Sequence, residues 1–190
     1  MQSRGVAKPW RRPFGPLRWA RSGFSLVETL VVLAVVAVLL GLAVPGVASW
    51  RASHGLQAVA EDLWNGLVLA RSQALVQQQR VVLCPLTASG GCDAQGAWSS
   101  GWQVFVDGNH NGQRDSGERV LLTRGALPVG VRLEGNSTVR LAVKYGADGR
   151  SDSLGGTFTL CREGRPQGWQ VVVNALGRAR MAQVGAPECP

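Results

Sequence analysis

The sequence lacks the residue clusters that zinc centres and catalytic sites need. No two of its four cysteines have CxxC spacing, and its only histidines, His54 and His110, stand far apart. A zinc site requires several such ligands at short spacing. Neither histidine has a plausible nucleophile as a partner, because His54 falls in a helical pattern and His110 in a Gly- and Asn-rich stretch. We therefore expect that the protein has no zinc site, requires no cofactor and is not an enzyme.

Acidic residues are absent from residues 1–23, which hold six of the 20 lysines and arginines. The formal net charge of the chain is +8, but the other 14 cations face 12 acids, so most of the excess belongs to this segment. The segment is rich in Arg, Pro and Trp and has no periodicity, so we expect a disordered basic leader. A smaller excess of +4 remains over residues 124–190 and predicts a modestly basic C-terminal face.

Charge is also missing from Phe24 to Ala48, where Glu28 is the single exception. An apolar stretch of this length can cross a bilayer as a helix. Because a basic leader precedes it, we expect the leader in the cytoplasm and the rest of the chain outside. A cleaved secretory signal is the competing interpretation, but the stretch is too long and lacks an A-x-A site. We assign residues 24–49 to a transmembrane segment.

A second helical pattern follows Pro45, a residue that kinks or loosens a helix. Apolar residues recur every three or four positions, as in an amphipathic helix, down to about Gln79. Residues 24–49 and 50–79 therefore predict one long helix, half in the membrane and half packed on a domain. The positions expected to face that domain are Leu56, Val59, Ala60, Leu63, Leu67, Ala70 and Ala74.

Short β-like runs separated by Gly, Pro, Asn and Asp occupy residues 80–190. Short links between the runs favour antiparallel pairing, and repeats of solenoid length are absent. The predicted fold class is α+β, with a long N-terminal helix packed on a C-terminal antiparallel β-sheet domain. The expected strands are 80–84, 101–106, 119–123, 130–134, 139–144, 157–161, 169–174 and 178–183.

The four cysteines all follow the apolar segment and allow three disulfide pairings. We favour Cys84–Cys92 and Cys161–Cys189, because each pair lies within one local segment. The second disulfide would also hold a C-terminal tail that otherwise frays. Such bonds form in an oxidising compartment such as the periplasm. The alternative is four buried free thiols.

The stretch GFSLVETLVVLAVVAVLLGLAVP resembles the N-terminus of type IV pilins and type II secretion pseudopilins. Three further blocks are similar to the GspH/FimT branch of minor pilins and pseudopilins: VLARSQAL (68–75), VVLCP (81–85) and GWQVFVDGNHNGQRDSGE (101–118). With these blocks the resemblance covers most of the chain. It implies a structural subunit that assembles with other pilin or pseudopilin subunits into a filament.

The resemblance also implies how the chain is processed. In this family a prepilin peptidase cuts after a glycine, here Gly23, and the new N-terminal residue, here Phe24, is N-methylated. Residues 1–23 are then a cleaved leader. The subunit would be a single-pass protein of the inner membrane with its C-terminal domain in the periplasm, assembled from there into a pilus or pseudopilus.

Glu28 occupies the fifth mature position, where the family carries a hallmark glutamate. In a filament it would lie near the α-amine of a neighbouring subunit, and the pair would offset part of the desolvation cost of each charge. The alternative is a carboxylate at the start of a helix, favoured by the macrodipole. Intramembrane carboxylates are usually functional, which favours the assembly role.

The stretch from Asp107 to Glu118 matches the calcium-loop pattern D-x-[DN]-x-[DN]-G-x5-E. Strands rather than helices are expected on both sides of it. The alternative is therefore a β-hairpin loop, in which Asn, Asp and Gly supply positive φ and local side-chain bonds. Three acids predict modest affinity at most. The candidate calcium ligands are Asp107, Asn109, Asn111, Asp115 and Glu118.

The sequence Gly177-Arg178-Ala179-Arg180 lies near the C-terminus. In an extended segment Arg178 and Arg180 share one side, and Gly177 permits a turn before them. The motif is similar to a G-R-x-R motif of FimT-like minor pilins that is linked to DNA binding in natural transformation. Paired guanidiniums can bind successive phosphates of double-stranded DNA without contacts that depend on the base sequence. The alternative is a solvated strand face with two scattered arginines.

Other residues could contribute to such a surface if the fold brings them near. Lys144, Arg162 and Arg165 would widen a basic patch around the motif. We expect Trp98, Trp102 and Trp169 to pack in the core or at its rim rather than to stack on bases.

The sequence therefore predicts a minor pilin of a type IV pilus that contacts DNA during natural transformation. A GspH-like pseudopilin that acts in protein export through a type II secretion system is the alternative. A third hypothesis is a minor pilin with a purely structural, priming role, in which the GRAR motif merely packs.

Overall fold

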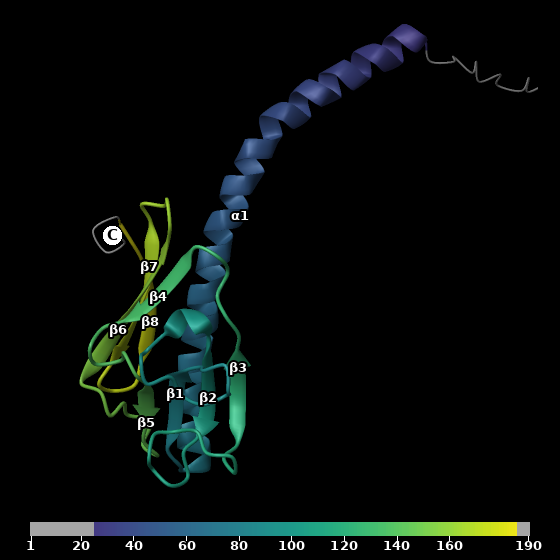
Figure 1. Cartoon of the computed structure of the whole chain (residues 1–190). Coiled ribbons are helices and arrows are strands. Elements are labelled where there is room, and N and C mark those ends of the chain that lie inside the picture. Colours follow the sequence, from purple (N-terminus) through teal and green to yellow (C-terminus); the bar gives the residue numbers. More distant parts are fainter. Residues whose placement is uncertain (1–24, 186–190) are drawn as a thin grey trace, which may run out of the picture. The chain divides into compact units, whose positions relative to one another are not determined.

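Helix α1 (Leu26–Gln77) is the first element of the chain, and eight strands follow it (Figure 1). The computed structural model describes the backbone of residues 25–185 and the side chains of residues 25–40 and 55–185. The chain divides into two compact units, Met1–Pro45 and Gly46–Pro190. Gly23, Phe24 and Cys189 lie outside the described residues.

The first unit contains the start of α1, and its sequence explains where the helix begins. The backbone N–H of Glu28 donates to Ser25 Oγ at 3.5 Å, and Thr29 N donates to Ser25 O at 3.1 Å. Ser-x-x-Glu is the pattern of a capping box, in which the first residue satisfies free N–H groups of the first turn. Ser25 therefore caps α1, and Glu28 lies in its first turn.

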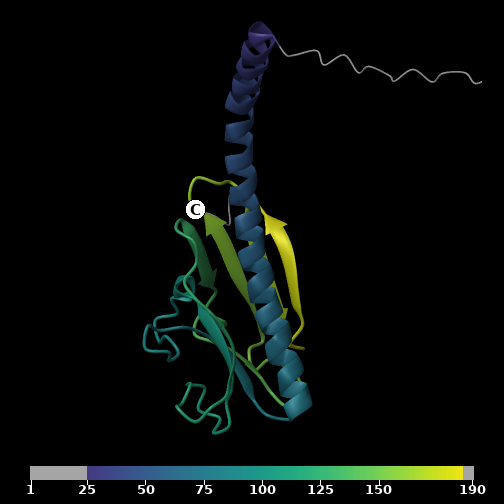
Figure 2. The same cartoon turned by 90° about the vertical axis from the view of Figure 1, so that its right-hand side faces the viewer.

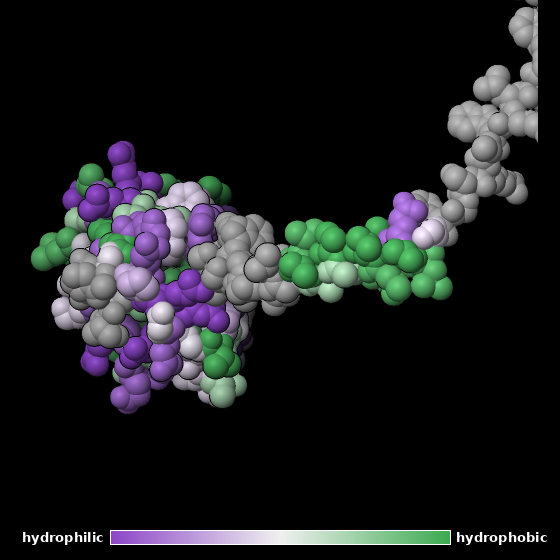
Figure 3. Space-filling model, turned by 90° about the horizontal axis from the view of Figure 1, so that it is seen from above, coloured by the Kyte–Doolittle hydropathy of each residue, from purple (hydrophilic) through white to green (hydrophobic). Residues whose placement is uncertain are grey.

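The side chains of residues 25–40 are exposed and form an almost continuous apolar surface, green in Figure 3. Their apolar members include Leu30, Val31 and Leu39, which are 58%, 56% and 60% exposed. Such a surface needs a partner of its own. Within the described residues, no helix combines the length and hydropathy of a membrane span.

In the second unit, one face of α1 is buried against the β-strands (Figure 2). The helical periodicity of the sequence predicted this face correctly, and every predicted position is at most 4% exposed. These positions are Leu56, Val59, Ala60, Leu63, Leu67, Ala70 and Ala74. The α+β fold class, with an N-terminal helix packed on an antiparallel β-domain, is therefore confirmed.

The strands form two four-stranded antiparallel sheets rather than one. The first sheet has the order β3-β2-β1-β5, and the second has the order β4-β6-β7-β8. The strands of the first sheet are β1 (Val81–Pro85), β2 (Trp102–Val106), β3 (Val120–Arg124) and β5 (Val143–Tyr145). The strands of the second sheet are β4 (Val131–Gly135), β6 (Gly155–Arg162), β7 (Gly168–Asn174) and β8 (Ala179–Val184).

One predicted strand, 139–144, is mostly wrong, because β5 begins only at Val143. Val139 lies in a turn closed by its N–H bond to Asn136 O at 3.1 Å, yet its side chain is fully buried. It fills the space above Gly156, where an added Cβ would lie 2.0 Å from Val139 Cγ1. A buried apolar residue in a turn has the same sequence signal as a strand residue.

Two tryptophans lie in the core, as expected from the sequence. Trp98, in the short 3-10 helix η1 (Trp98–Ser100), contacts Phe158 edge to face with ring centroids 4.8 Å apart. Its indole N–H donates to Arg140 O at 2.8 Å, so its polar atom is satisfied. Trp102 is also fully buried, and Trp169 is half-buried at the rim. These contacts favour packing over base stacking.

A disulfide joins Cys84 at the end of β1 to Cys92 in the loop that follows. This is the pairing favoured from the sequence. Cys161 in β6 is also disulfide-bonded, and its predicted partner, Cys189, lies outside the described residues. Cross-links of this kind stabilise a fold mainly by restricting the unfolded chain.

Truncating the buried face of α1 should destabilise the domain. We expect Leu63→Ala, at a fully buried position, to lower the free energy of unfolding by about 2–5 kcal/mol, since it leaves a cavity. Val76→Ala, on the same helix but 76% exposed, should change it by less than about 0.5 kcal/mol. Urea unfolding followed by circular dichroism measures both values. Equal losses would contradict the assigned helix face.

Tyr145 provides a second test, because its buried hydroxyl has no hydrogen-bond partner within the described residues. Removal of an unsatisfied polar atom costs little, so we expect Tyr145→Phe to leave the free energy of unfolding at neutral pH unchanged or raised by about 1 kcal/mol.

The same variant should change the pH dependence of stability. Burial raises the pKa of Tyr145 above its usual value of 10.0, and Arg71 opposes this only in part. The stability that this group contributes is complete below pH 10 and is lost as pH rises further, because the unfolded tyrosine ionises first. Urea titrations from neutral to alkaline pH should show a shallower decline for Tyr145→Phe. An unchanged slope, or a large loss at neutral pH, would contradict this.

Candidate functional site

The turn between β7 and β8 carries the GRAR motif, and Asn174 organises it. Asn174 O accepts the N–H of Gly177 at 2.8 Å, and Asn174 N donates to Arg178 O at 3.1 Å. The Asn174 side chain adds a third bond, because its Oδ1 accepts the N–H of Arg178 at 2.9 Å. The backbone at the base of the motif is therefore fixed by three hydrogen bonds to one residue.

Gly177 occupies a position that only glycine fits. Its φ is +74°, in the left-handed region. An added Cβ would lie 2.2 Å from Gly149 O, 3.0 Å from the Tyr145 ring and 3.2 Å from Arg71 Nε. Arg71 on α1 in turn donates from Nε to Gly149 O at 3.0 Å. The turn thus packs directly against the Gly149 turn and α1. This packing fixes the position of Gly177 and therefore that of Arg178, the next residue.

Arg178 and Arg180 are exposed, whereas Ala179 and Met181 pack against the core. Arg180 pairs with Val172 in the β7–β8 ladder. Within the part of the chain that the structure describes, no hydrogen bond or ion pair involves either guanidinium. Two unpaired guanidiniums two residues apart, one just before an edge strand and one on it, can contact successive anionic groups.

Two shallow hollows lie between α1 and β8. The first, of about 320 Å³, is lined by Arg71, Ser72, Gly177 and Arg178 with apolar neighbours. The second, of about 580 Å³, is lined by Trp64, Arg180 and Glu61 among others. The Trp64 indole N–H donates to Ala179 O at 3.2 Å and so closes part of the free edge of β8.

Arg71 is the residue that sequence reasoning missed. It lies within the VLARSQAL block that carries the family resemblance, but no pattern linked it to a turn more than 100 residues away. Its guanidinium both supports the Gly149 turn and lines the hollow beside Arg178. Contacts between a helix and a distant turn leave no periodic signal in a single sequence.

The predicted widening of the basic patch does not occur around this turn. Arg162 and Arg165 line a hollow of about 290 Å³ with Trp169 and Gln183, at the opposite end of the β7–β8 hairpin. Lys144 lies against the Asp107–Glu118 loop, since an added Cβ on Gly112 would be 2.7 Å from Lys144 Nζ. Arg71 and Arg178 line the hollow beside the β7–β8 turn, and Arg180 lines the next one.

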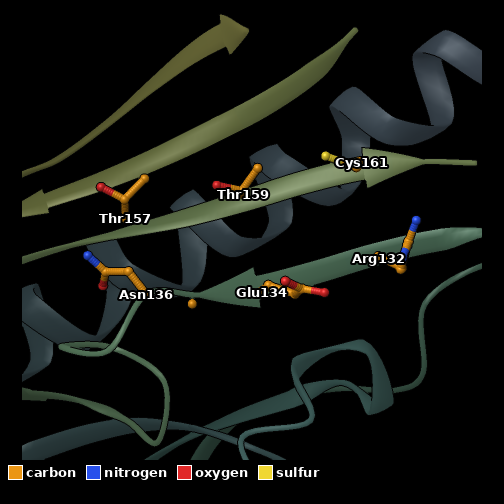
Figure 4. A pocket seen from close by; sticks show the side chains of 7 residues that line it. Arg132, Glu134, Asn136, Thr157, Thr159 and Cys161 are labelled. Carbon is orange, nitrogen blue, oxygen red and sulfur yellow. The ribbon is translucent and has the colours of Figure 1, made fainter. Parts of the chain in front are cut away.

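Another hollow, of about 400 Å³, lies on the outer face of the second sheet, between β4 and β6 (Figure 4). Arg132 and Glu134 line it from β4, and Thr157, Thr159 and Cys161 line it from β6. The cysteine is disulfide-bonded, so the hollow offers no thiolate nucleophile. Its open, mixed-charge surface is typical of a sheet face rather than of an active site.

The candidate calcium loop connects β2 to β3 and is internally hydrogen-bonded. The carboxylate of Asp115 accepts the side-chain N–H groups of Asn109 at 2.7 Å and Asn111 at 2.8 Å. These two bonds lower the pKa of Asp115. Over the described residues, no group of three or more His, Cys, Asp or Glu side chains is placed to hold a metal ion. Any cation here therefore needs amide or carbonyl ligands as well.

Comparisons with known proteins agree with this architecture. The family model "Type II transport protein GspH" matches residues 59–177, and the model "Prokaryotic N-terminal methylation motif" matches residues 20–44. A pilin-like protein, PilA1 of Thermus thermophilus, is 31% identical in an alignment of 173 residues that covers 85% of this chain and 98% of that protein.

Solved structures show the same fold. The type IV minor pilin FimU of Pseudomonas aeruginosa is 20% identical, with a TM-score of 0.53 over 74% of this chain and 96% of FimU. The minor pseudopilin EpsH from the type II secretion system of Vibrio cholerae is 13% identical, with a TM-score of 0.50 over 67% of this chain and 95% of EpsH. The family consists of structural subunits rather than enzymes. The chain belongs to the GspH family of type IV pilin-like proteins and is a minor pilin or pseudopilin.

Proposed function

We propose that this subunit is a minor pilin of a type IV pilus that contacts double-stranded DNA through Arg178 and Arg180 during natural transformation. The observation that carries the proposal is the pair of exposed, unpaired guanidiniums of Arg178, in the turn before edge strand β8, and Arg180, on β8 itself. The match to the family model ends at residue 177, so this part of the proposal depends on the chain's own residues.

Assembly is proposed to depend on the other end of the chain. A prepilin peptidase would cut after Gly23 and remove residues 1–23, and Phe24 would then be methylated. Residues 24–49 would hold the subunit in the inner membrane with residues 80–190 in the periplasm. The match to the N-terminal methylation motif over residues 20–44 supports this processing.

Glu28 would pair with the α-amine of a neighbouring subunit. The exposed apolar surface of residues 26–40 would move from lipid to neighbouring helices when the filament forms. Glu28 lies in the first turn of α1, so its negative charge also stabilises the helix by interacting favourably with the macrodipole. The carboxylate can therefore fill both roles, as a local helix-stabilising charge and as a contact between subunits.

A pseudopilin of a type II secretion system is the second candidate. The family description and the fold of EpsH favour it as directly as FimU favours a pilin. The purely structural minor pilin is a variant of the first candidate in which the arginines do not bind DNA. The three hypotheses differ in whether the chain binds DNA at physiological salt, because only the first requires the arginine pair to meet phosphates.

The arginine pair gives the direct test. We expect detergent-solubilised full-length protein to retard duplex DNA of any sequence, more strongly at low salt than at physiological salt. The double variant Arg178→Ala with Arg180→Ala should weaken binding at least about 10-fold. The slope of the logarithm of the binding constant against the logarithm of the salt concentration should fall by roughly two, about one for each lost phosphate contact. Gel shift or fluorescence anisotropy at two salt concentrations measures both effects.

The matched control is Arg119→Ala with Arg140→Ala, which removes the same charge from two other exposed positions. This control should bind nearly as well as the parent. Equal weakening by both double variants would show that only net charge matters. Absence of DNA binding by the parent protein would favour the pseudopilin or the structural minor pilin.

The Gly177 turn gives a second test, because it positions Arg178. We expect Gly177→Ala to lower the free energy of unfolding by about 2 kcal/mol or more, since strain at positive φ and a backbone clash add. Gly164→Ala is the control: its φ is +72°, but nothing lies within 4 Å of an added Cβ. It should lose only about 1 kcal/mol. Urea unfolding measures both, and equal losses would show that the close packing of Gly177 has no energetic role.

A further inference from the structure

The loop from Asp107 to Glu118 has a buried acidic oxygen that nothing in the described structure satisfies. Asp107 is 0% exposed. Its Oδ2 accepts the N–H of Gly112 at 3.0 Å, but its Oδ1 is buried without any hydrogen-bond partner. A buried carboxylate oxygen without a partner is costly. The same carboxylate contacts the centre of the loop through Gly112, so its unsatisfied oxygen is available as a ligand for a cation bound by the loop.

The spacing of oxygen-bearing residues gives the identity of that cation. Carboxylate and amide side chains occupy positions 1, 3, 5, 9 and 12 of the loop, with glycine at position 6. Hard cations with many oxygen ligands, above all Ca²⁺, are bound by this order of residues. The side chains in ligand positions are those of Asp107, Asn109, Asn111, Asp115 and Glu118.

The backbone already follows a tight curve around the loop centre. His110 and Gly112 both have positive φ, at 65° and 75°. Glu118, at the last position, reaches back across the loop and accepts the N–H of Gly108 at 2.9 Å and that of Asp115 at 3.0 Å. The two carboxylates that start and end the pattern are therefore both turned toward the loop's own backbone.

Other contacts limit the strength of a site here. Asp115 is held by two side-chain amides, so it is the acid best suited to act through a bridging water, as position 9 often does. Two cations also lie close: Arg114 is within the loop, and Lys144 Nζ lies beside Gly112. A ligand set with two direct carboxylates and nearby positive charge binds calcium weakly, in the range of about 10⁻⁴–10⁻³ M.

We propose that the Asp107–Glu118 loop binds one Ca²⁺ ion, with Asp107 and Glu118 as carboxylate ligands and Asn109 and Asn111 as amide ligands. The ion satisfies the buried Asp107 oxygen and stabilises the β2–β3 connection. Arg80 donates to His110 O at 3.3 Å and forms an ion pair with Asp152. An ion that orders the loop also stabilises this contact of Arg80 with His110. The site is separate from the arginine pair and does not depend on DNA binding.

Calorimetry on the detergent-solubilised full-length chain tests the proposal. Titration with CaCl2 should show one site with a Kd near or below about 1 mM, and MgCl2 should bind at least about 10-fold more weakly. Thermal unfolding in about 5 mM CaCl2 should occur several degrees higher than in MgCl2 at equal ionic strength, because ligand binding stabilises the folded state.

Two variants identify the ligands. Glu118→Gln should weaken calcium binding at least about 10-fold, whereas Glu134→Gln, an exposed carboxylate on β4, should leave it unchanged. If Glu118→Gln does not fold, Asn111→Ala, at an exposed position, should weaken binding instead. The proposal is overturned if the parent chain shows neither heat nor a thermal shift with calcium. It is also overturned if the loop variants bind calcium as tightly as Glu134→Gln.

Discussion

Burial of one face of α1 is the interaction on which the rest of the domain depends. The helix contributes leucine and valine side chains to the core, but several buried positions are small, among them Ala60, Gly66 and Ala70. At Gly66 an added Cβ would lie 3.2 Å from Leu83 and 3.3 Å from the Trp102 indole. The small residues therefore let β1 and β2 approach the helix closely, and large side chains fill the remaining space. Close packing of this kind is sensitive to single methylene groups.

Packing on the helix also explains how candidate site residues at distant points of the chain come together. Arg71 is fixed on α1, and it bonds to the Gly149 turn, against which Gly177 packs. The position of Arg178 thus depends on a chain of contacts that begins in the helix. The Asp107–Glu118 loop is held separately, through Arg80 at the start of β1. The two candidate sites accordingly belong to different sheets and depend on different contacts.

Much of the fold could be predicted from the sequence, because its strongest signals are local. The three- and four-residue spacing of apolar positions identified the buried face of α1, and short apolar runs located most of the strands. Val139 misled the prediction, because a turn residue that fills a gap above a glycine is as apolar as a strand residue. The division into two sheets could not be predicted, since it depends on which strands pair across long connections.

The candidate sites show the same limit. The GRAR motif and the calcium pattern are short and contiguous, so the sequence revealed both. The contribution of Arg71 and the burial of Asp107 were not visible, because each depends on neighbours that are distant in sequence. Family resemblance identified the class of the protein, but it could not supply these contacts, which are properties of this chain's own packing.

Edge strand β8 has a consequence beyond ligand binding. An exposed edge offers unpaired N–H and C=O groups that invite another strand and lead to aggregation. Here Trp64 occupies one such carbonyl, that of Ala179, and Arg178 and Arg180 place positive charge along the same edge. Where such subunits assemble side by side, a charged, partly capped edge would oppose strand pairing between neighbouring domains. The two arginines would therefore oppose aggregation through this edge even in a protein that does not bind DNA.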